Sequence, residues 1–260
     1  MSTIIYPSPI VGPIHSRRLG VSLGINLMPD DGKVCTFDCL YCECGFNADH
    51  RAHRPRPTRG DVATALESKL QTMQTEGTRP DVLTFSGNGE PTGHPDFSGI
   101  VDDVLRLRDH YFPSAKVSVL SNATFAHLPQ VHEALMRVDN NILKLDTVSP
   151  SYIQTVDRPV SPQYDVHRII DTMRSFDGHV IVQTIFMHGR AMDGTAVDNV
   201  GEEYVAPWLS ALEYIGPQQV MIYTIDRETP DPYLAKATPE ELDAIGRRVE
   251  ALGIACTVAY

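Results

Sequence analysis

Short apolar runs alternate with amphipathic stretches along most of the chain. Val82–Phe85 is a short β-branched run bounded by Pro-Asp and Ser-Gly, and Asp96–Tyr111 then carries apolar residues near one helical face. Further apolar runs each predict a strand: Lys116–Leu120, Ile142–Asp146, His179–Phe186 and Val220–Ile225. The amphipathic stretches predict helices: Leu128–Val138, Tyr164–Phe176, one near Val205–Tyr214, and Thr238–Gly253. The last begins with Thr-Pro-Glu-Glu and ends with Gly, which are start and stop signals of a helix.

Strands that alternate with helices at this pitch indicate βαβ units and a parallel sheet. A first strand within Val21–Met28 and a helix near Asp61–Met73 bring the pattern to about six strand–helix units, and a final strand is expected within 254–260. Six units are too few for an eightfold barrel, so a partial, open barrel and an open doubly wound sheet are the candidates. Met187–Tyr204 interrupts the alternation, and we expect a surface loop there rather than a lid.

The composition is that of an ordinary globular protein, with 260 residues, 42% of them hydrophobic and 21% charged. No signal peptide and no run of about 18 apolar residues is evident, so a cytoplasmic protein without membrane contact is expected. The net charge of −11 argues against a generic nucleic-acid binder. His50–Arg59 nevertheless holds four arginines and no acid. Such a segment suits an anionic substrate, although a solvated loop explains it as well.

Four of the five cysteines lie within Cys35–Cys44, and Cys35, Cys39 and Cys42 form a C-x3-C-x2-C pattern. This crowding does not suit a disulfide framework. Thiolates that meet at one point select zinc, copper(I) or an iron–sulfur cluster. Three arrangements are open: a zinc knot with Cys44 as fourth ligand, a closed four-thiolate cluster, or a cluster held by three thiolates with one iron free. The zinc knot is least favoured, because structural zinc sites draw paired ligands from two separated places.

Cys35, Cys39 and Cys42, with the aromatic Tyr41 before the last of them, resemble the signature of the radical S-adenosylmethionine (radical SAM) superfamily. The resemblance implies that the three cysteines hold a 4Fe-4S cluster whose fourth iron takes the amino nitrogen and carboxylate of S-adenosylmethionine. It further implies that one electron, from a donor of the flavodoxin or ferredoxin type, cleaves this cofactor to methionine and a 5′-deoxyadenosyl radical. The radical then removes hydrogen from the substrate, while the protein binds and orients the reactants and excludes water from the site.

A glycine-rich stretch directly follows the strand Val82–Phe85 and contains Gly87, Asn88, Gly89 and Glu90. Glycines let a ligand lie against bare backbone, and a carboxylate suits an ammonium group. The stretch resembles the GGEP motif of the superfamily, from which it departs at Asn88. The resemblance implies that it receives the methionyl amino group of the cofactor.

Polar residues also mark the next two predicted strands. Asn122 ends one of them, where the superfamily commonly places a side chain for the ribose. Lys144 and Asp146 share one face of the other, and an unpaired charge inside a barrel is costly. Contact with the cofactor carboxylate and the substrate is one interpretation, and an ion pair that fills the barrel is the other. We include Tyr41, Asn122, Lys144 and Asp146 among the predicted cofactor-binding residues.

From about Gly12 to the helix at Thr238 the chain resembles one branch of the superfamily, the wybutosine-forming tRNA enzymes and uncharacterised relatives. The resemblance rests on GPIHSRRLGVSLGINL, GEPTGHP, SNATF, LKLD and VDRP. It makes RNA the expected substrate, with Arg17, Arg18, Arg51 and Arg54 as candidate contacts to phosphates. The alternatives are a radical enzyme that acts on a protein or peptide, such as an activase, and a non-enzymatic iron–sulfur or zinc protein.

We therefore predict a single α/β domain over residues 1–260, a partial (β/α)6 open barrel of parallel strands of the radical SAM type. Residues 1–30 would form a lead-in with the first strand, 31–59 the cluster loop and basic segment, and 60–260 the remaining units. Cys256 is expected to be a buried apolar side chain, and the role of Cys44 stays open.

Overall fold

One sheet organises the protein. The computed structural model describes residues 3–16 and 19–260. Within this part of the chain eight strands pair in the order β1-β2-β3-β4-β5-β6-β8-β10. The strand β1 is antiparallel to β2, and all other neighbours are parallel. The strands are β1 (Ile10–Ser16), β2 (Gly20–Ile25), β3 (Val82–Phe85), β4 (Lys116–Ser121), β5 (Asn140–Lys144), β6 (Ile181–Ile185), β8 (Gln219–Tyr223) and β10 (Ala255–Ala259).

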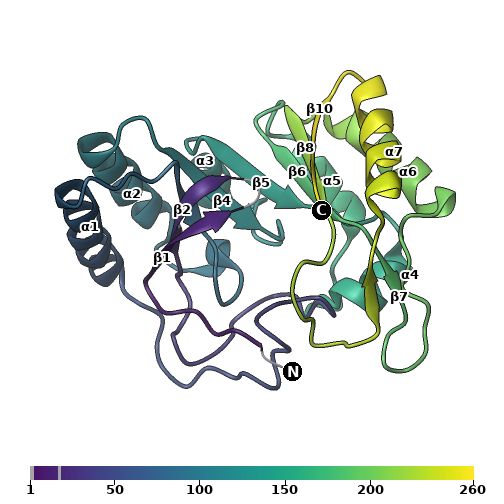
Figure 1. The fold of residues 1–260 in the computed structure, drawn as a ribbon, viewed down its shortest axis with the longest axis horizontal. Coiled ribbons are helices and arrows are strands. Elements are labelled where there is room, and N and C mark those ends of the chain that lie inside the picture. The colour runs from purple at the N-terminus through teal and green to yellow at the C-terminus, as the bar shows by residue number, and fades with distance from the viewer. Residues whose placement is uncertain (1–2, 17–18) are drawn as a thin grey trace.

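Helices connect the successive parallel strands and cover the sheet. They are α1 (Arg59–Thr75), α2 (Phe97–Tyr111), α3 (Pro129–Leu135), α5 (Val166–Arg174), α6 (Glu202–Ile215) and α7 (Pro239–Ala251). Figure 1 shows α1 and α2 at one end of the molecule and α6 and α7 at the other, with the curled sheet between them. The predicted partial barrel of six β/α units is confirmed, and the doubly wound alternative is wrong because the strands follow one another in chain order.

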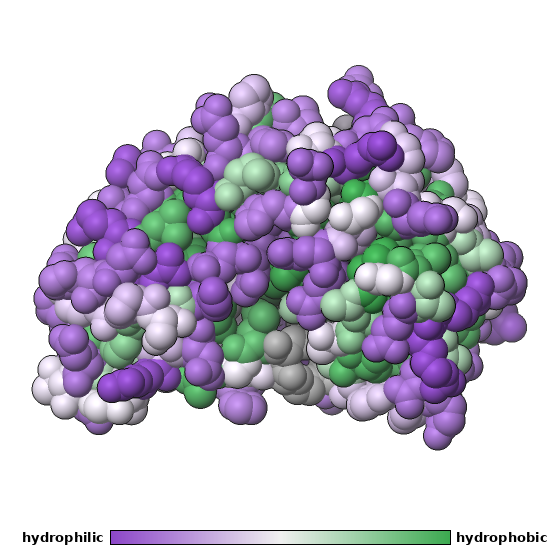
Figure 2. All heavy atoms as spheres, turned by 90° about the horizontal axis from the view of Figure 1, so that it is seen from above, coloured by the Kyte–Doolittle hydropathy of each residue, from purple (hydrophilic) through white to green (hydrophobic). Residues whose placement is uncertain are grey.

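Shorter elements lie in the loops. They are η1 (Pro91–Gly93), the turn α4 (Pro150–Tyr152) that continues into the π-helical η2 (Ile153–Asp157), and an antiparallel pair of β7 (Met187–Gly189) with β9 (Leu234–Lys236). In the described residues no helix is long and apolar enough to cross a membrane. The face in Figure 2 carries mostly hydrophilic side chains, with apolar ones in separate patches.

The core forms where the apolar pattern predicts it. All four residues of β3 are buried, and the predicted face of α2 buries Ile100, Val101, Val104 and Leu107 against the sheet. The start signal of α7 is also confirmed. The Thr238 hydroxyl accepts a hydrogen bond from the Glu241 amide (3.2 Å), and the Glu241 carboxylate accepts one from the Thr238 amide (2.8 Å). Such reciprocal capping satisfies amides that the first helical turn leaves free.

Two segments differ from the sequence-based expectation. The strand β1 was not predicted, because Pro13 and the glycines around it weaken its apolar pattern. Met187–Tyr204 is a loop only over 190–201, because β7 precedes it and α6 begins at Glu202. His188 in β7 ties this segment down: Nδ1 lies 2.7 Å from Asp198 Oδ2, and Nε2 lies 2.9 Å from Glu241 Oε2 on α7.

Candidate functional site: a cysteine loop at the mouth of the partial barrel

The cysteine loop runs between β2 and α1 and is held from two sides. On one side the Val34 amide donates to the Asn88 carbonyl (2.9 Å). On the other side the Leu40 amide donates to the Val156 carbonyl (2.9 Å). These partners follow β3 and β5, so both lie where parallel strands end. The loop is therefore fixed at the carboxyl edge of the sheet, which is where an α/β architecture places its site.

All five cysteines are free thiols. Cys39 and Cys44 are buried, whereas Cys35 and Cys42 are half-buried. The Cys44 thiol is turned toward the loop after β3, with Sγ 3.5 Å from the Gly87 carbonyl oxygen. In the described residues no three His, Cys, Asp or Glu side chains converge as ligands of a single ion. A four-iron cluster is bound differently, because each of its thiolates is bonded to a separate iron, and three free thiols on one loop fit that donor set.

The glycines after β3 are required by the chain itself. Gly87 and Gly89 have φ of +132° and +147°, which residues with a side chain rarely adopt. A Cβ on Gly89 would lie 1.9 Å from the Val34 carbonyl oxygen. The bare backbone at Gly89 thus receives the start of the cysteine loop, and its predicted contact with a cofactor stays a prediction.

Asn88 and Glu90 are engaged inside the protein. The buried Asn88 amide donates to the carbonyls of Tyr6 (2.8 Å) and Pro29 (2.9 Å). The Glu90 carboxylate accepts from the Ser121 hydroxyl (2.8 Å) and the Asn122 amide (2.7 Å). Burial raises the pKa of Glu90, and these hydrogen bonds oppose that rise. Both side chains join the loop after β3 to its neighbours, and direct contact with a ligand remains a prediction for them.

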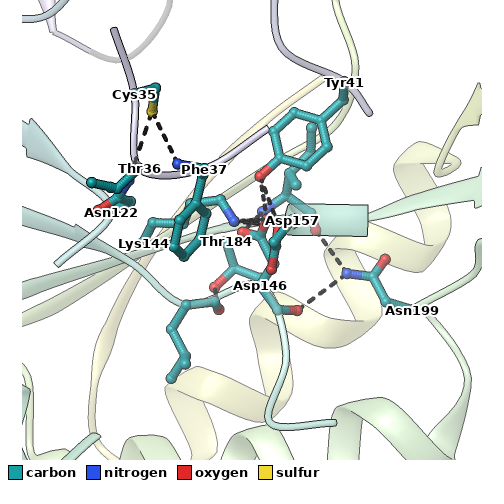
Figure 3. A network of polar contacts seen from close by, with 12 residues as sticks. Cys35, Thr36, Phe37, Tyr41, Asn122, Lys144, Asp146, Asp157, Thr184 and Asn199 are labelled. Carbon is teal, nitrogen blue, oxygen red and sulfur yellow. Dashed lines mark hydrogen bonds and ion pairs between the residues drawn. The ribbon is translucent and has the colours of Figure 1, made fainter. Parts of the chain in front are cut away.

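Asn122 lies beside the cysteine loop at the end of β4. Its side-chain amide donates to the Thr36 hydroxyl (2.8 Å) and lies 3.8 Å from Cys35 Sγ. Figure 3 shows it next to the first cysteine and apart from Asp146. The position predicted from the strand end is therefore close to the predicted cluster.

Lys144 lies at the centre of a buried charge network (Figure 3). Its ammonium is 2.7 Å from Asp146 Oδ2 and also pairs with Asp157. The Tyr41 hydroxyl donates to Asp146, and the Lys144 ammonium lies 5.1 Å from the ring centroid of Phe37. Burial opposes the charge on Lys144, but Asp146 and Asp157 outweigh it and raise the lysine pKa. The structure thus brings together three predicted residues and adds Asp157, which was visible in the sequence only as part of VDRP.

A cavity of about 380 Å³ opens beside the loop. This volume is within the roughly 300–1,000 Å³ of small-molecule sites. Of the predicted residues, Tyr41, Cys42 and Gly87 line it. The wall also contains a hydroxyl pair that the sequence did not reveal, Ser22 and Thr84, whose oxygens are 2.8 Å apart. The cavity therefore joins the cysteine loop to the interior of the partial barrel.

Comparison by sequence finds relatives of this chain among curated proteins. No protein-family model matches the chain. A UPF0026 protein of Helicobacter pylori (strain J99) is 30% identical over 191 residues, which are 70% of this chain and 57% of that protein. A UPF0026 protein of Synechocystis sp. is 28% identical over 232 residues, 85% of this chain and 77% of that protein. The chain spans little more than half the length of the Helicobacter relatives.

Among solved structures, a radical SAM methyltransferase from Sphaerobacter thermophilus matches 91% of this chain and 65% of its own, with a TM-score of 0.66 and 14% identity. The chain has the radical SAM fold. Streptococcus suis SuiB bound to its precursor peptide SuiA has a TM-score of 0.62 at 14% identity and matches 91% of this chain and 48% of its own. TYW1 with a lysine–pyruvate adduct bound has a TM-score of 0.61 at 10% identity and matches 88% of this chain and 73% of its own. The predicted resemblance is confirmed at the level of the fold.

The four arginines predicted to contact phosphates differ in how the structure places them. Arg17 and Arg18 lie outside the described residues. Arg51 is exposed, and its backbone bridges Lys33. Arg54 is also exposed, and its Nη1 lies 3.1 Å from both carboxylate oxygens of Asp30, so it already has an acidic partner. This pairing between residues 24 positions apart was not visible in the sequence.

One polar cluster at the cavity mouth was missed. Arg227, in the loop after β8, donates to the Tyr6 hydroxyl (2.8 Å) and the Glu43 carboxylate (2.8 Å). All three residues line the cavity. They come from distant parts of the chain, and only Glu43, between Cys42 and Cys44, had a sequence signal.

Proposed function

We propose that the chain is a radical SAM enzyme that holds a 4Fe-4S cluster through Cys35, Cys39 and Cys42 and binds S-adenosylmethionine in the adjoining cavity. The single observation that carries the proposal is the position of three free thiols at the mouth of a partial barrel, next to a cavity of about 380 Å³. When bound and reduced, the cluster would supply one electron for cleavage of the cofactor to methionine and a 5′-deoxyadenosyl radical. A protein of the flavodoxin or ferredoxin type is the proposed donor.

The contribution of the chain is to position the loop and shield the cavity. The Tyr41 ring is held by its hydroxyl, which donates to Asp146, so the loop cannot turn freely between Cys39 and Cys42. Arg227, Glu43 and Tyr6 connect three segments of the chain at the cavity mouth. Glu90 and Asn122 hold the loop after β3 against the end of β4.

Lys144 is not proposed as a nucleophile. A lysine that forms an adduct with a carbonyl compound must release its proton first. The two carboxylates around Lys144 raise its pKa and keep it protonated. The adduct described for TYW1 therefore finds no counterpart at this side chain.

The test is anaerobic loading with iron and sulfide, followed by reduction with dithionite in the presence of S-adenosylmethionine. We expect iron and sulfide in the ratio of a four-iron cluster and release of 5′-deoxyadenosine. Cys39→Ala should abolish both, Cys44→Ala should keep them, and Cys256→Ala is the matched control far from the loop. Zinc in the anaerobic protein, or loss of the cluster in Cys44→Ala, would contradict the proposal.

RNA is our proposed substrate class, supported by the arginine segment that follows the cysteine loop. Arg51 and Arg54 are exposed there. Binding through about two phosphates would make log Kd change with log salt at a slope of roughly 1.5–2. Arg51→Ala should reduce this slope for tRNA. Tight binding of a peptide with no binding of RNA would favour the second class, a protein- or peptide-modifying enzyme.

A further inference from the structure

Lys33 is a buried cation two residues before the first cysteine. Its side chain is 1% exposed. Its backbone amide donates to the His50 carbonyl (2.6 Å), and the next residue, Val34, is bonded to the loop after β3. Lys33 reaches across the cysteine loop, and its ammonium donates to the Gly45 carbonyl oxygen at 2.7 Å. The lysine thus joins the two ends of the cysteine loop.

The protein offers this ammonium little counter-charge. In the described residues the one ion pair of Lys33 is with Asp38, at 3.7 Å, which is beyond normal hydrogen-bond length. The Asp38 carboxylate also pairs with Arg158 (3.2 Å) and accepts from the Asn47 amide (2.7 Å). One carboxylate therefore serves two cations. A buried charge that is poorly compensated costs several kcal/mol, roughly, so its retention calls for a partner.

The cysteine sulfurs are the candidate partner. The ammonium lies within the cysteine loop, because Lys33 is two residues before Cys35 and the Gly45 carbonyl that it binds is three residues after Cys42. These are the same three sulfurs that the proposed function assigns to the cluster. Thiolates bound to iron would stay negatively charged, and they would face a fixed buried cation.

We propose that Lys33 is a positioning residue for the cluster: its buried ammonium holds the two ends of the cysteine loop together and balances the charge of the three thiolates. This inference rests on the proposed function. Hydrogen bonds to ligand sulfurs and the local charge set the reduction potential of iron–sulfur clusters. A fixed cation stabilises the reduced, more negative state, so Lys33 makes the cluster easier to reduce and slower to lose.

The test compares Lys33→Met, which keeps the length and removes the charge, with Lys33→Arg, which keeps the charge. Lys236→Met, on the exposed surface of β9, is the control for net charge. Each full chain is loaded anaerobically, and the midpoint potential is measured by redox titration followed by electron paramagnetic resonance. We expect Lys33→Met to disfavour reduction at least tenfold, which for a one-electron couple is about 59 mV. Lys33→Arg and Lys236→Met should stay near the wild type.

A second readout is the rate at which a chelator removes iron from the oxidised cluster. It should rise at least threefold in Lys33→Met alone. If Lys33→Met folds, by circular dichroism, yet takes up no cluster while Lys33→Arg does, the need for the charge is confirmed. A wild-type potential and chelation rate in Lys33→Met overturn the inference and leave the proposed function intact. A wild-type chain that holds no cluster overturns both.

Discussion

Removing Lys144 tests whether the charge network inside the barrel is a structural ion pair. Lys144→Met leaves Asp146 and Asp157 facing each other, and both carboxylates are buried, with side-chain exposures of 0% and 4%. Breaking a buried pair by removing one partner costs about 3–5 kcal/mol. With a urea dependence near 3 kcal/mol per molar, about the upper value for small proteins, the unfolding midpoint should fall by roughly 1–1.7 M.

The assay is equilibrium urea unfolding of the chain without added iron, followed by circular dichroism. Arg248→Met is the matched control, because it breaks an exposed pair with Glu202 at 2.7 Å and should cost less than about 1 kcal/mol. The unfolding midpoint of Asp157→Asn should lie between those of the two variants, since Lys144 would still be paired with Asp146. If Lys144→Met has the same unfolding midpoint as the wild type, the charge network does not stabilise the fold, and binding of a ligand is the role left for it.

Three further perturbations follow from single contacts. Burial lowers the pKa of His188, but its hydrogen bonds to Glu241 and to a second carboxylate outweigh burial and raise it. The stabilisation that the protonated ring gives to the fold is therefore complete below pH 6.5 and is lost as pH rises through the folded pKa. His188→Gln should therefore lower the free energy of unfolding by up to about 1 kcal/mol at pH 6 and by less at pH 8.5; an equal loss at both pH values would contradict this. Gly89→Ala should destabilise the chain by about 3 kcal/mol or more in thermal unfolding, because φ is +147° and the Val34 carbonyl blocks a Cβ. It should also reduce iron uptake, and normal iron uptake would show that the cysteine loop can move to make room. Thr238→Ala should cost about 1 kcal/mol and Thr238→Ser almost nothing, as measured by urea unfolding.

The sequence predicted the fold well because its signals are local. Apolar runs such as Val82–Phe85 and the capping residues of α7 act within a few positions, and each fixes an element independently of the others. Chain order then became strand order, since each helix returns the chain to the neighbouring position of the sheet. The strand β1 escaped prediction because Gly12 and Pro13 interrupt its apolar pattern, and its pairing with β2 is not a local signal.

The sequence brought candidate site residues together only where one motif carries several of them, as Cys35, Cys39 and Cys42 do. Contacts between distant residues were not accessible: Asp157 reaches Lys144 through η2, and Arg54 meets Asp30 across the surface. Residue type also did not reveal that the Asn88 side chain is bonded to the N-terminal segment, through the Tyr6 carbonyl.

The same long-range contacts explain how a loop without regular structure can present three thiols in fixed positions. Its start is bonded to the loop after β3, its middle to η2 after β5, and its end to Lys33 at its own start, so two other parts of the chain and one contact within the loop determine where the sulfurs lie. Each of these contacts uses backbone atoms of the cysteine loop, and none of them uses a thiol. The packing of the sheet edge therefore prepares the donor set before any metal binds, and a side chain at Gly89 would displace the start of the loop at Val34 without removing a sulfur.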